Sequence, residues 1–125
     1  MNLLLDTHVV LWWLDDSPML SEKTKTLIAD PQNIVFISVA VIWEISIKQA
    51  LGKLEIPDDF RRVLERQHFD FLDITPDHAY AVAALPPHHR DPFDRMLIAQ
   101  AKVEGMHLLS HDRRMLLYDI SVIEA

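Results

Sequence analysis

The chain has 125 residues, a formal net charge of −7 and no cysteine. Its length fits one domain, residues 1–125, with a core that needs no disulfides. The lack of cysteine excludes disulfides and thiolate metal sites and fits a reducing, cytoplasmic location. We expect no membrane association, because no apolar stretch approaches the length of a span. The negative charge argues against nucleic-acid binding unless acidic side chains cluster around cations.

The first third of the chain alternates short apolar runs with helical patterns. Residues 2–5 (NLLL) predict a buried strand. Residues 8–14 predict a helix, with the preceding Asp-Thr pair as its N-cap. Residues 21–29 (SEKTKTLIA) predict a second helix capped by its serine. After the turn cluster DPQN, residues 34–38 (IVFIS) are β-branched and aromatic and predict a second buried strand.

The middle of the chain predicts two helices and one exposed strand. A helix from about 39 to 51 begins after the serine of IVFIS and ends before Gly52, where a left-handed residue is favoured. A second helix runs from about 57 to 67, with basic residues on its outer face. Residues 69–74 (FDFLDI) alternate apolar and polar side chains, which is typical of a strand near a sheet edge.

The last third of the chain also alternates helical patterns with short apolar runs. Thr75 and Pro76 open a helix, and the loop LPPHHRD follows it. Asp91 caps a helix that reaches Gly105. The segments MHLLS and ISVI predict strands, with a short helix in HDRRML between them. Strands that alternate with helices predict an α/β fold: a mostly parallel sheet of four or five strands with helices on both faces.

Four acidic residues follow the ends of these predicted strands. Asp6 ends the first strand, Glu44 lies two turns into the helix after the second, and Asp112 follows MHLLS. Asp94 lies in the first turn of a helix that starts at the same sheet edge or at the opposite one. Ligands of open α/β sheets bind beyond the carboxyl ends of the strands. If the four acids meet, their repulsion favours bound Mg²⁺ or Mn²⁺, which suits phosphoryl-transfer chemistry.

Each acid also has a simpler interpretation. Asp6 could only cap a helix, and for Asp91 a cap is the first assignment. Glu44 stands four residues before Lys48, the spacing of an ordinary surface pair, although the helix around it is apolar. Asp112 could be a turn residue. The joint placement at strand ends is what favours a site.

Four segments carry a resemblance to a known family: LLLDTHVVLWWL, SVAVIWEISIKQALGKL, DPFDRMLIAQA and LLSHDRRM. The chain resembles the PIN-domain ribonucleases and, within them, is most similar to the VapC-type toxins of toxin–antitoxin modules. The match covers nearly the whole chain, in the family's order and spacing. DPFDRMLIAQA is its most specific block.

The resemblance implies an α/β/α sandwich and metal-dependent cleavage of single-stranded or looped RNA. Asp6, Glu44 and Asp94 match the core acidic positions, and Asp112 matches a fourth, more variable one. Mg²⁺ or Mn²⁺ held by these acids would activate a water for attack on phosphorus, leaving a 5′-phosphate and a 3′-hydroxyl. The resemblance also implies a cognate antitoxin that covers the groove and a homodimer built from the apolar helices.

Further residues are assigned around the acids. Thr7 and Ser110 match flanking polar positions and are expected to orient carboxylates or water. Asp91 belongs to the block DPFDRMLIAQA. It is assigned first as a helix cap and second as an outer-sphere residue that supports the metal site. Basic residues beside the acids are expected to contact RNA phosphates: Lys48, Lys53, Arg90, Arg95, Arg113 and Arg114.

Several other interpretations compete with this one. Seven histidines are present, but without HExxH or cysteine a zinc site is disfavoured; His8 and His111 could touch RNA or water. The three tryptophans lie in apolar helices and are expected in the core, although one of the adjacent pair Trp12 and Trp13 could be exposed. A phosphatase with Asp6 as nucleophile would want a second acid where His8 stands. A non-catalytic interaction module that keeps only the fold remains the other alternative, and metal titration would separate it from an enzyme.

Overall fold

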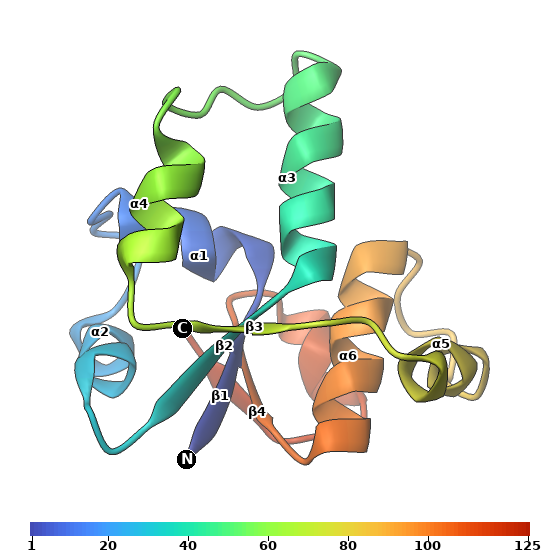
Figure 1. Cartoon of the computed structure of the whole chain (residues 1–125). Coiled ribbons are helices and arrows are strands. Elements are labelled where there is room, and N and C mark those ends of the chain that lie inside the picture. Colours follow the sequence, from blue (N-terminus) through green and yellow to red (C-terminus); the bar gives the residue numbers. More distant parts are fainter.

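A computed structural model describes residues 1–125 (Figure 1). It contains five strands, six α-helices and one 3₁₀ turn. The elements are β1 Asn2–Leu5, α1 Thr7–Leu14, α2 Glu22–Ala29, β2 Ile34–Ser38, α3 Val39–Ala50, α4 Phe60–Arg66, β3 Asp70–Leu72, α5 Pro76–Ala83, α6 Pro92–Glu104, β4 His107–Ser110, the 3₁₀ turn η1 Arg113–Leu117 and β5 Val122–Glu124.

The sheet is parallel throughout, in the order β3-β2-β1-β4-β5. The central strand β1 pairs with β2 on one side, where Leu3 lies opposite Val35, and with β4 on the other, where Leu4 lies opposite Leu108. β3 lies at an edge, as its alternating sequence predicts. The expected parallel sheet of four or five strands is therefore confirmed.

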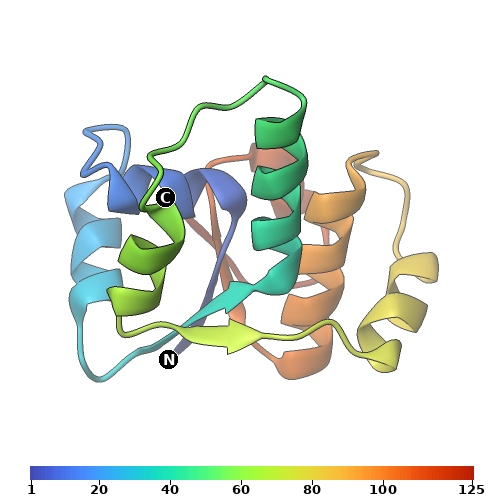
Figure 2. The same cartoon turned by 45° about the horizontal axis from the view of Figure 1, so that its top comes forward.

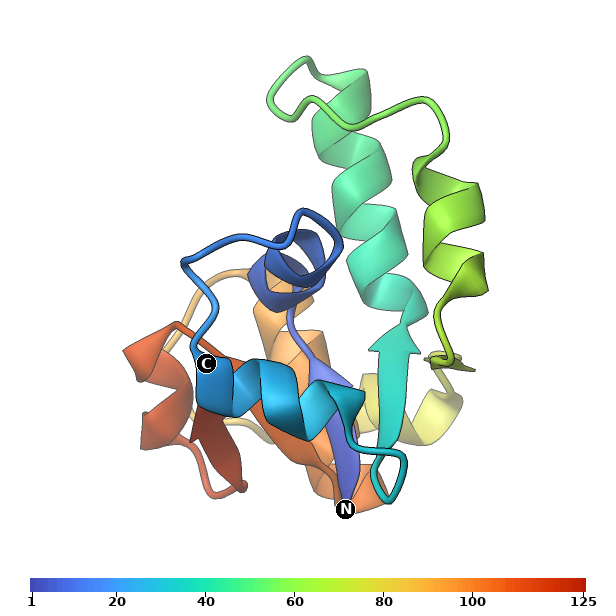
Figure 3. The same ribbon diagram turned by 90° about the vertical axis from the view of Figure 1, so that its left-hand side faces the viewer.

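Helices cover both faces of this sheet. α2 lies on one side, and α5 and α6 lie on the other (Figures 1 and 3). The core joins 22 buried residues, among them Leu3, Leu4 and Leu5 of β1, which are completely buried. Burial of each such leucine contributes roughly 2 kcal/mol. The continuous apolar sequence of β1 follows from its position between two helical layers, and the α/β/α sandwich is confirmed.

The helix α3 continues directly from β2. Ser38 ends the strand and caps the helix, because its hydroxyl accepts a hydrogen bond from the Ala40 amide at 3.0 Å. α3 then rises beyond the carboxyl edge of the sheet with α4 beside it (Figure 3). α6 runs along α3, with α5 outside it (Figure 2). Glu44, two turns into α3, is thereby carried above the sheet edge.

Four predicted elements differ from the observed ones. The helix expected from residue 57 begins at Phe60, because the Phe60 amide first closes a turn on the Pro57 carbonyl and Asp59 makes no side-chain cap. The strand expected over 69–74 keeps only the three residues of β3. The last strand lies two residues later than ISVI, and the short helix before it is a 3₁₀ turn.

The tryptophans are placed differently from one another. Trp12 and Trp13 are partly buried and pack against the core, as expected. The expectation is wrong for Trp43, which is 58% exposed on α3 and meets the edge of Phe93 at 5.1 Å between ring centroids. Trp43 thus leaves an aromatic ring exposed on α3 beside the polar Ser46.

No helix is both long enough and apolar enough to cross a bilayer.

Candidate functional site

Asp6 links the central strand to the first helix. It follows β1 directly, in an extended conformation, and its Oδ1 accepts the Val9 amide at 2.9 Å, which caps α1. Its Oδ2 accepts the hydroxyl of Ser110 at 2.5 Å, because the pairing of β1 with β4 brings both strand ends together. Asp6 is only 4% exposed, and this burial raises the pKa of its carboxyl above the usual value. The cap interpretation is correct but leaves the carboxylate buried at the sheet edge.

Glu44 reaches the same edge from α3. Its Oε1 accepts the hydroxyl of Thr7 at 2.5 Å, and its Oε2 lies 2.6 Å from the ammonium of Lys48. Glu44 is 4% exposed, so this is not the solvated surface pair that the spacing alone suggests. The hydrogen bond with Glu44 raises the pKa of Lys48. Thr7 therefore orients a carboxylate, as expected of its position.

Asp94 lies in the first turn of α6. The side chain of Asp91 caps this helix by accepting the amides of Phe93 and Asp94, at 2.8 and 3.1 Å. The start of α6 lies at the edge where β1 and β4 end, which the sequence leaves open. Burial raises the pKa of Asp94 to about 7, helped by the negative charges of Asp91, Asp6, Glu44 and Asp112.

Asp112 follows β4 and caps the 3₁₀ turn. Its Oδ1 accepts the amide of Arg114, and the guanidinium of Arg114 lies 2.8 Å from its Oδ2. Hydrogen bonds from Arg114 hold the pKa of Asp112 well below its ordinary value. Ser110 connects this acid to Asp6, because its hydroxyl also accepts the Asp112 amide at 3.0 Å.

The structure adds one residue that the sequence reasoning passes over. His89, in the loop between α5 and α6, places its Nε2 3.0 Å from Oδ2 of Asp94 and 3.0 Å from Oδ2 of Asp112. One nitrogen and two carboxylate oxygens thus lie within 4.8 Å of one another. The histidine stands two residues before Asp91, where the block DPFDRMLIAQA begins, and this proximity was the available sequence clue.

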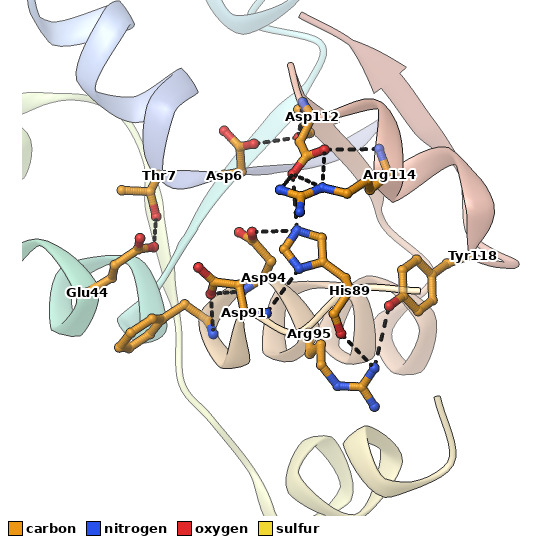
Figure 4. A network of polar contacts seen from close by, with 12 residues as sticks. Asp6, Thr7, Glu44, His89, Asp91, Asp94, Arg95, Asp112, Arg114 and Tyr118 are labelled. Atoms are coloured by element: carbon orange, nitrogen blue, oxygen red, sulfur yellow. Dashed lines mark hydrogen bonds and ion pairs between the residues drawn. The ribbon is translucent and has the colours of Figure 1, made fainter. Parts of the chain in front are cut away.

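The four predicted acids converge (Figure 4). They come from the end of β1, from α3, from α6 and from the loop after β4, and their side chains point toward a common space. Two of them, Asp6 and Asp94, have raised pKa values, which is the expected result of crowded buried carboxylates without a cation. Oxygen donors of this kind match the preference of Mg²⁺ and Mn²⁺.

Three of the six basic residues expected to contact RNA are otherwise engaged. Lys48 is paired with Glu44, and Arg114 is paired with Asp112. Arg95 donates to the carbonyl oxygens of Val82, Leu85, Pro86 and His89 and to the hydroxyl of Tyr118. Its guanidinium is therefore used to hold the α5–α6 loop, because these contacts occupy both terminal nitrogens. Arg90 and Arg113 are exposed beside the acids and belong to no ion pair.

Aromatic rings border the acids on one side. Trp12 lies 5.7 Å from His8 and 5.2 Å from His111, measured between ring centroids. His8 and His111 are exposed, and each is within two residues of a clustered acid. His8, Trp12 and His111 therefore form an aromatic cluster that is close in sequence to Asp6 and Asp112.

The chain also matches a known protein family. The family model of the PIN domain matches residues 3–121. The chain belongs to the PIN domain family. The expected family resemblance is thereby confirmed across nearly the whole chain.

This PIN domain has a curated relative and several similar solved structures. It is 28% identical over 118 residues to "Ribonuclease VapC22" of Mycobacterium tuberculosis, covering 91% of this chain and 89% of the relative. The structure of VapBC2 from Rickettsia felis bound to a promoter DNA fragment superposes with a TM-score of 0.75, at 13% identity and 98% coverage of both chains. DNA-bound VapBC from Salmonella typhimurium gives 0.72, at 15% identity, covering 98% of this chain and 97% of that one. These likenesses establish the shared fold.

Proposed function

We propose that this PIN domain is a metal-dependent endoribonuclease and the toxin of a type II toxin–antitoxin system. The convergence of Asp6, Glu44, Asp94 and Asp112 at one sheet edge is the observation that carries the proposal. The relative named Ribonuclease VapC22 supports the activity, at 28% identity over nearly the whole chain. The VapBC complexes among the similar structures support a cognate antitoxin as partner.

Asp6 and Asp94 would hold Mg²⁺ or Mn²⁺, with Glu44 and Asp112 completing the anionic surroundings. The donor set fits a hard divalent ion, because burial and neighbouring acids raise the pKa values of Asp6 and Asp94, and a bound cation would offset that repulsion. When bound, such an ion lowers the pKa of a coordinated water and stabilises negative charge on the phosphoryl group. Ser110 and Thr7 fix the orientation of Asp6 and Glu44, so the carboxylates need no rearrangement on binding.

RNA would approach along the rim of the acid cluster. Exposed Arg90 and Arg113 are placed to contact phosphates, which positions a strand without reading its sequence. The rings of His8, Trp12 and His111 offer faces on which unpaired bases can stack. This arrangement suits single-stranded or looped RNA and offsets the overall negative charge locally.

Protein partners would use the apolar surfaces. A groove of about 540 Å³ runs between α3 and α4 and is lined by Ile42, Ile45, Ile56, Phe60 and Leu64, among others. We assign this groove to an apolar segment of the antitoxin. A basic side chain of the antitoxin could then lie among the acids and replace the positive charge of the metal ion. The exposed Trp43 and its neighbour Phe93 are assigned to a homodimer contact.

An RNA cleavage assay tests the proposed activity. The wild-type chain is incubated with tRNA, rRNA and mRNA and Mn²⁺, with and without EDTA. We expect defined fragments with 5′-phosphate ends that disappear with EDTA. Cleavage that persists in EDTA would contradict metal dependence. Absence of both Mn²⁺ binding and RNA cleavage would favour the non-catalytic interaction module.

Growth assays test the toxin assignment separately. Expression of the wild-type chain alone should arrest growth, and co-expression of the small protein encoded beside it should restore growth. Equal growth in both cases would remove the toxin assignment and leave the nuclease intact. A phosphatase is disfavoured because both oxygens of Asp6 accept hydrogen bonds and exposed His8 stands where a second acid would be needed.

A further inference from the structure

The loop between α5 and α6 places a buried imidazole at the edge of the acid cluster. The His89 side chain is 2% exposed and lies between the carboxylates of Asp94 and Asp112, on the side away from Glu44 (Figure 4). Its Nε2 is 3.0 Å from an oxygen of each. A histidine so close to two acids can act either as a third metal ligand or as a hydrogen-bond donor that holds the acids in place.

The second ring nitrogen decides between these roles. The backbone amide of Asp91 donates to His89 Nδ1 at 3.1 Å, so Nδ1 presents its lone pair and carries no hydrogen. The ring proton is therefore on Nε2, which donates to Oδ2 of Asp112 at 3.0 Å and lies 3.0 Å from Oδ2 of Asp94. Coordination through Nε2 would need the opposite tautomer, which would direct an N–H of Nδ1 against the Asp91 amide.

The backbone position of His89 is fixed from α6. Arg95 donates to the His89 carbonyl and to the carbonyl oxygens of Val82, Leu85 and Pro86, so the whole loop is tied to the helix that carries Asp94. The same side chain also donates to the carbonyl of Val82 in the last turn of α5. The imidazole and Asp94 are thus parts of one rigid unit.

We propose that His89 is a positioning residue: its Nε2–H donates to Asp112 and lies 3.0 Å from Asp94, which holds the two carboxylates in the geometry that receives the divalent ion. This inference rests on the proposed metal-dependent function. The imidazole nitrogen and one oxygen of each carboxylate lie within 4.8 Å of one another, a closeness of two like charges that their repulsion opposes. Loss of such a supporting hydrogen bond typically weakens metal affinity by about 10–100-fold.

Mn²⁺ titration of the intact chain, followed by the electron paramagnetic resonance signal of free Mn²⁺, tests the role. The glutamine of His89→Gln can place an amide N–H near the position of Nε2, whereas the shorter asparagine of His89→Asn reaches only the position of Nδ1. We expect His89→Asn to weaken Mn²⁺ binding by at least about 10-fold and His89→Gln by no more than about 3-fold. His88→Asn is the matched control, because His88 is exposed and faces Tyr118 instead of the acids. It should bind Mn²⁺ as the wild type does.

Spectroscopy shows whether His89 donates a hydrogen bond to the acids or binds the metal directly. Electron spin echo spectra of the Mn²⁺-loaded wild type should lack the ¹⁴N coupling of a directly bound imidazole, and the presence of that coupling would overturn the donor role. Equal Mn²⁺ affinity of His89→Asn and wild type would also overturn the proposal. RNA affinity in EDTA should be the same for wild type and His89→Asn, since the change acts on the ion. Failure of the wild type to bind Mn²⁺ at all would instead refute the proposed function.

Discussion

The acid cluster has two sides that are held in different ways. Asp6 and Glu44 are almost fully buried, and regular elements supply their hydroxyl partners: Ser110 from β4 and Thr7 from the first turn of α1. Asp94 and Asp112 are more open, and their partner His89 comes from a loop. The first side is thus fixed by the sheet, whereas the second depends on how a loop is tied down.

The charges on the two sides are balanced differently as well. Lys48 faces Glu44, and Arg114 faces Asp112, so each side has one cation at its outer rim. Asp94 lies between them without a cationic partner, and its pKa is raised to about 7. The centre of the cluster is therefore where added positive charge would stabilise the protein most.

The largest expected effect comes from removing a carboxylate on either side. Asp6→Asn and Asp94→Asn should each lower RNA cleavage by ~10³-fold or more, about 4 kcal/mol of transition-state stabilisation, because a neutral amide cannot replace the charge that holds the ion. Cleavage rates measured with excess Mn²⁺ check this. Asp77→Asn, an exposed acid in the first turn of α5, is the control and should cleave normally. Full activity of either variant would refute the assignment.

A smaller effect is expected from the hydroxyl on the sheet side. Ser110→Ala removes the donor to Asp6 and the acceptor of the Asp112 amide, so both sides lose a support. Mn²⁺ affinity should fall by about 10-fold, with the fold retained. Isothermal titration and circular dichroism together measure this. Unchanged Mn²⁺ affinity would show that the buried hydroxyl does not orient Asp6 for binding.

The stability of the metal-free protein should depend on pH through Asp94. This carboxyl binds its proton more tightly in the folded chain, with a pKa of about 7 against 3.8. The free energy of unfolding should therefore fall as pH rises from about 4 to about 7. The lowered pKa of Asp112 acts below pH 4, outside this window.

Thermal unfolding in EDTA at pH 5 and pH 8 measures this dependence. The Tm should be lower at pH 8 by at least about 4 °C, the change that ~1 kcal/mol produces in a domain of this size. Asp94→Asn should reduce this dependence, because it cannot ionise, and the raised pKa of Asp6 leaves a remainder of the same sign. A wild-type Tm that rises between these two pH values would show that ionisation of Asp94 does not destabilise the folded protein.

The smallest effect is expected at the aromatic rim. His111→Ala should weaken binding of single-stranded RNA by about 3–10-fold, the loss of part of one stacking contact, while Mn²⁺ affinity stays unchanged. RNA binding measured in EDTA, where cleavage cannot occur, checks this. His68→Ala is the control, since His68 is exposed before β3 and outside the acid cluster. Equal RNA affinity of both variants would show that the aromatic rim does not bind RNA.

Much of the fold follows from local sequence. The strand NLLL and the caps at Asp6, Ser38 and Asp91 are determined by residues within a few positions, and the structure has them where the sequence predicts. The weak edge strand β3 is shorter than predicted, since its pairing with β2 determines its length more than its own residues do.

The site was predictable only where it depends on strand ends. Asp6 and Asp112 follow paired strands, so their proximity could be expected, whereas the side on which α6 begins required the tertiary structure. His89 and Arg95 show what local reasoning misses. A histidine in a loop and an arginine beside an acid have many possible partners. Only the loop conformation places His89 beside the carboxylates and Arg95 beside the carbonyl groups.

Direct titration of the whole protein with Mn²⁺ tests the central claim, that carboxylates from β1, α3, α6 and the loop after β4 form one receptor for a hard divalent ion. Wild type should bind Mn²⁺ with saturation, and both Asp6→Asn and Asp94→Asn should lose that binding, although their acids lie 88 positions apart in the chain. Mn²⁺ affinity that is the same in wild type and in both variants would contradict it.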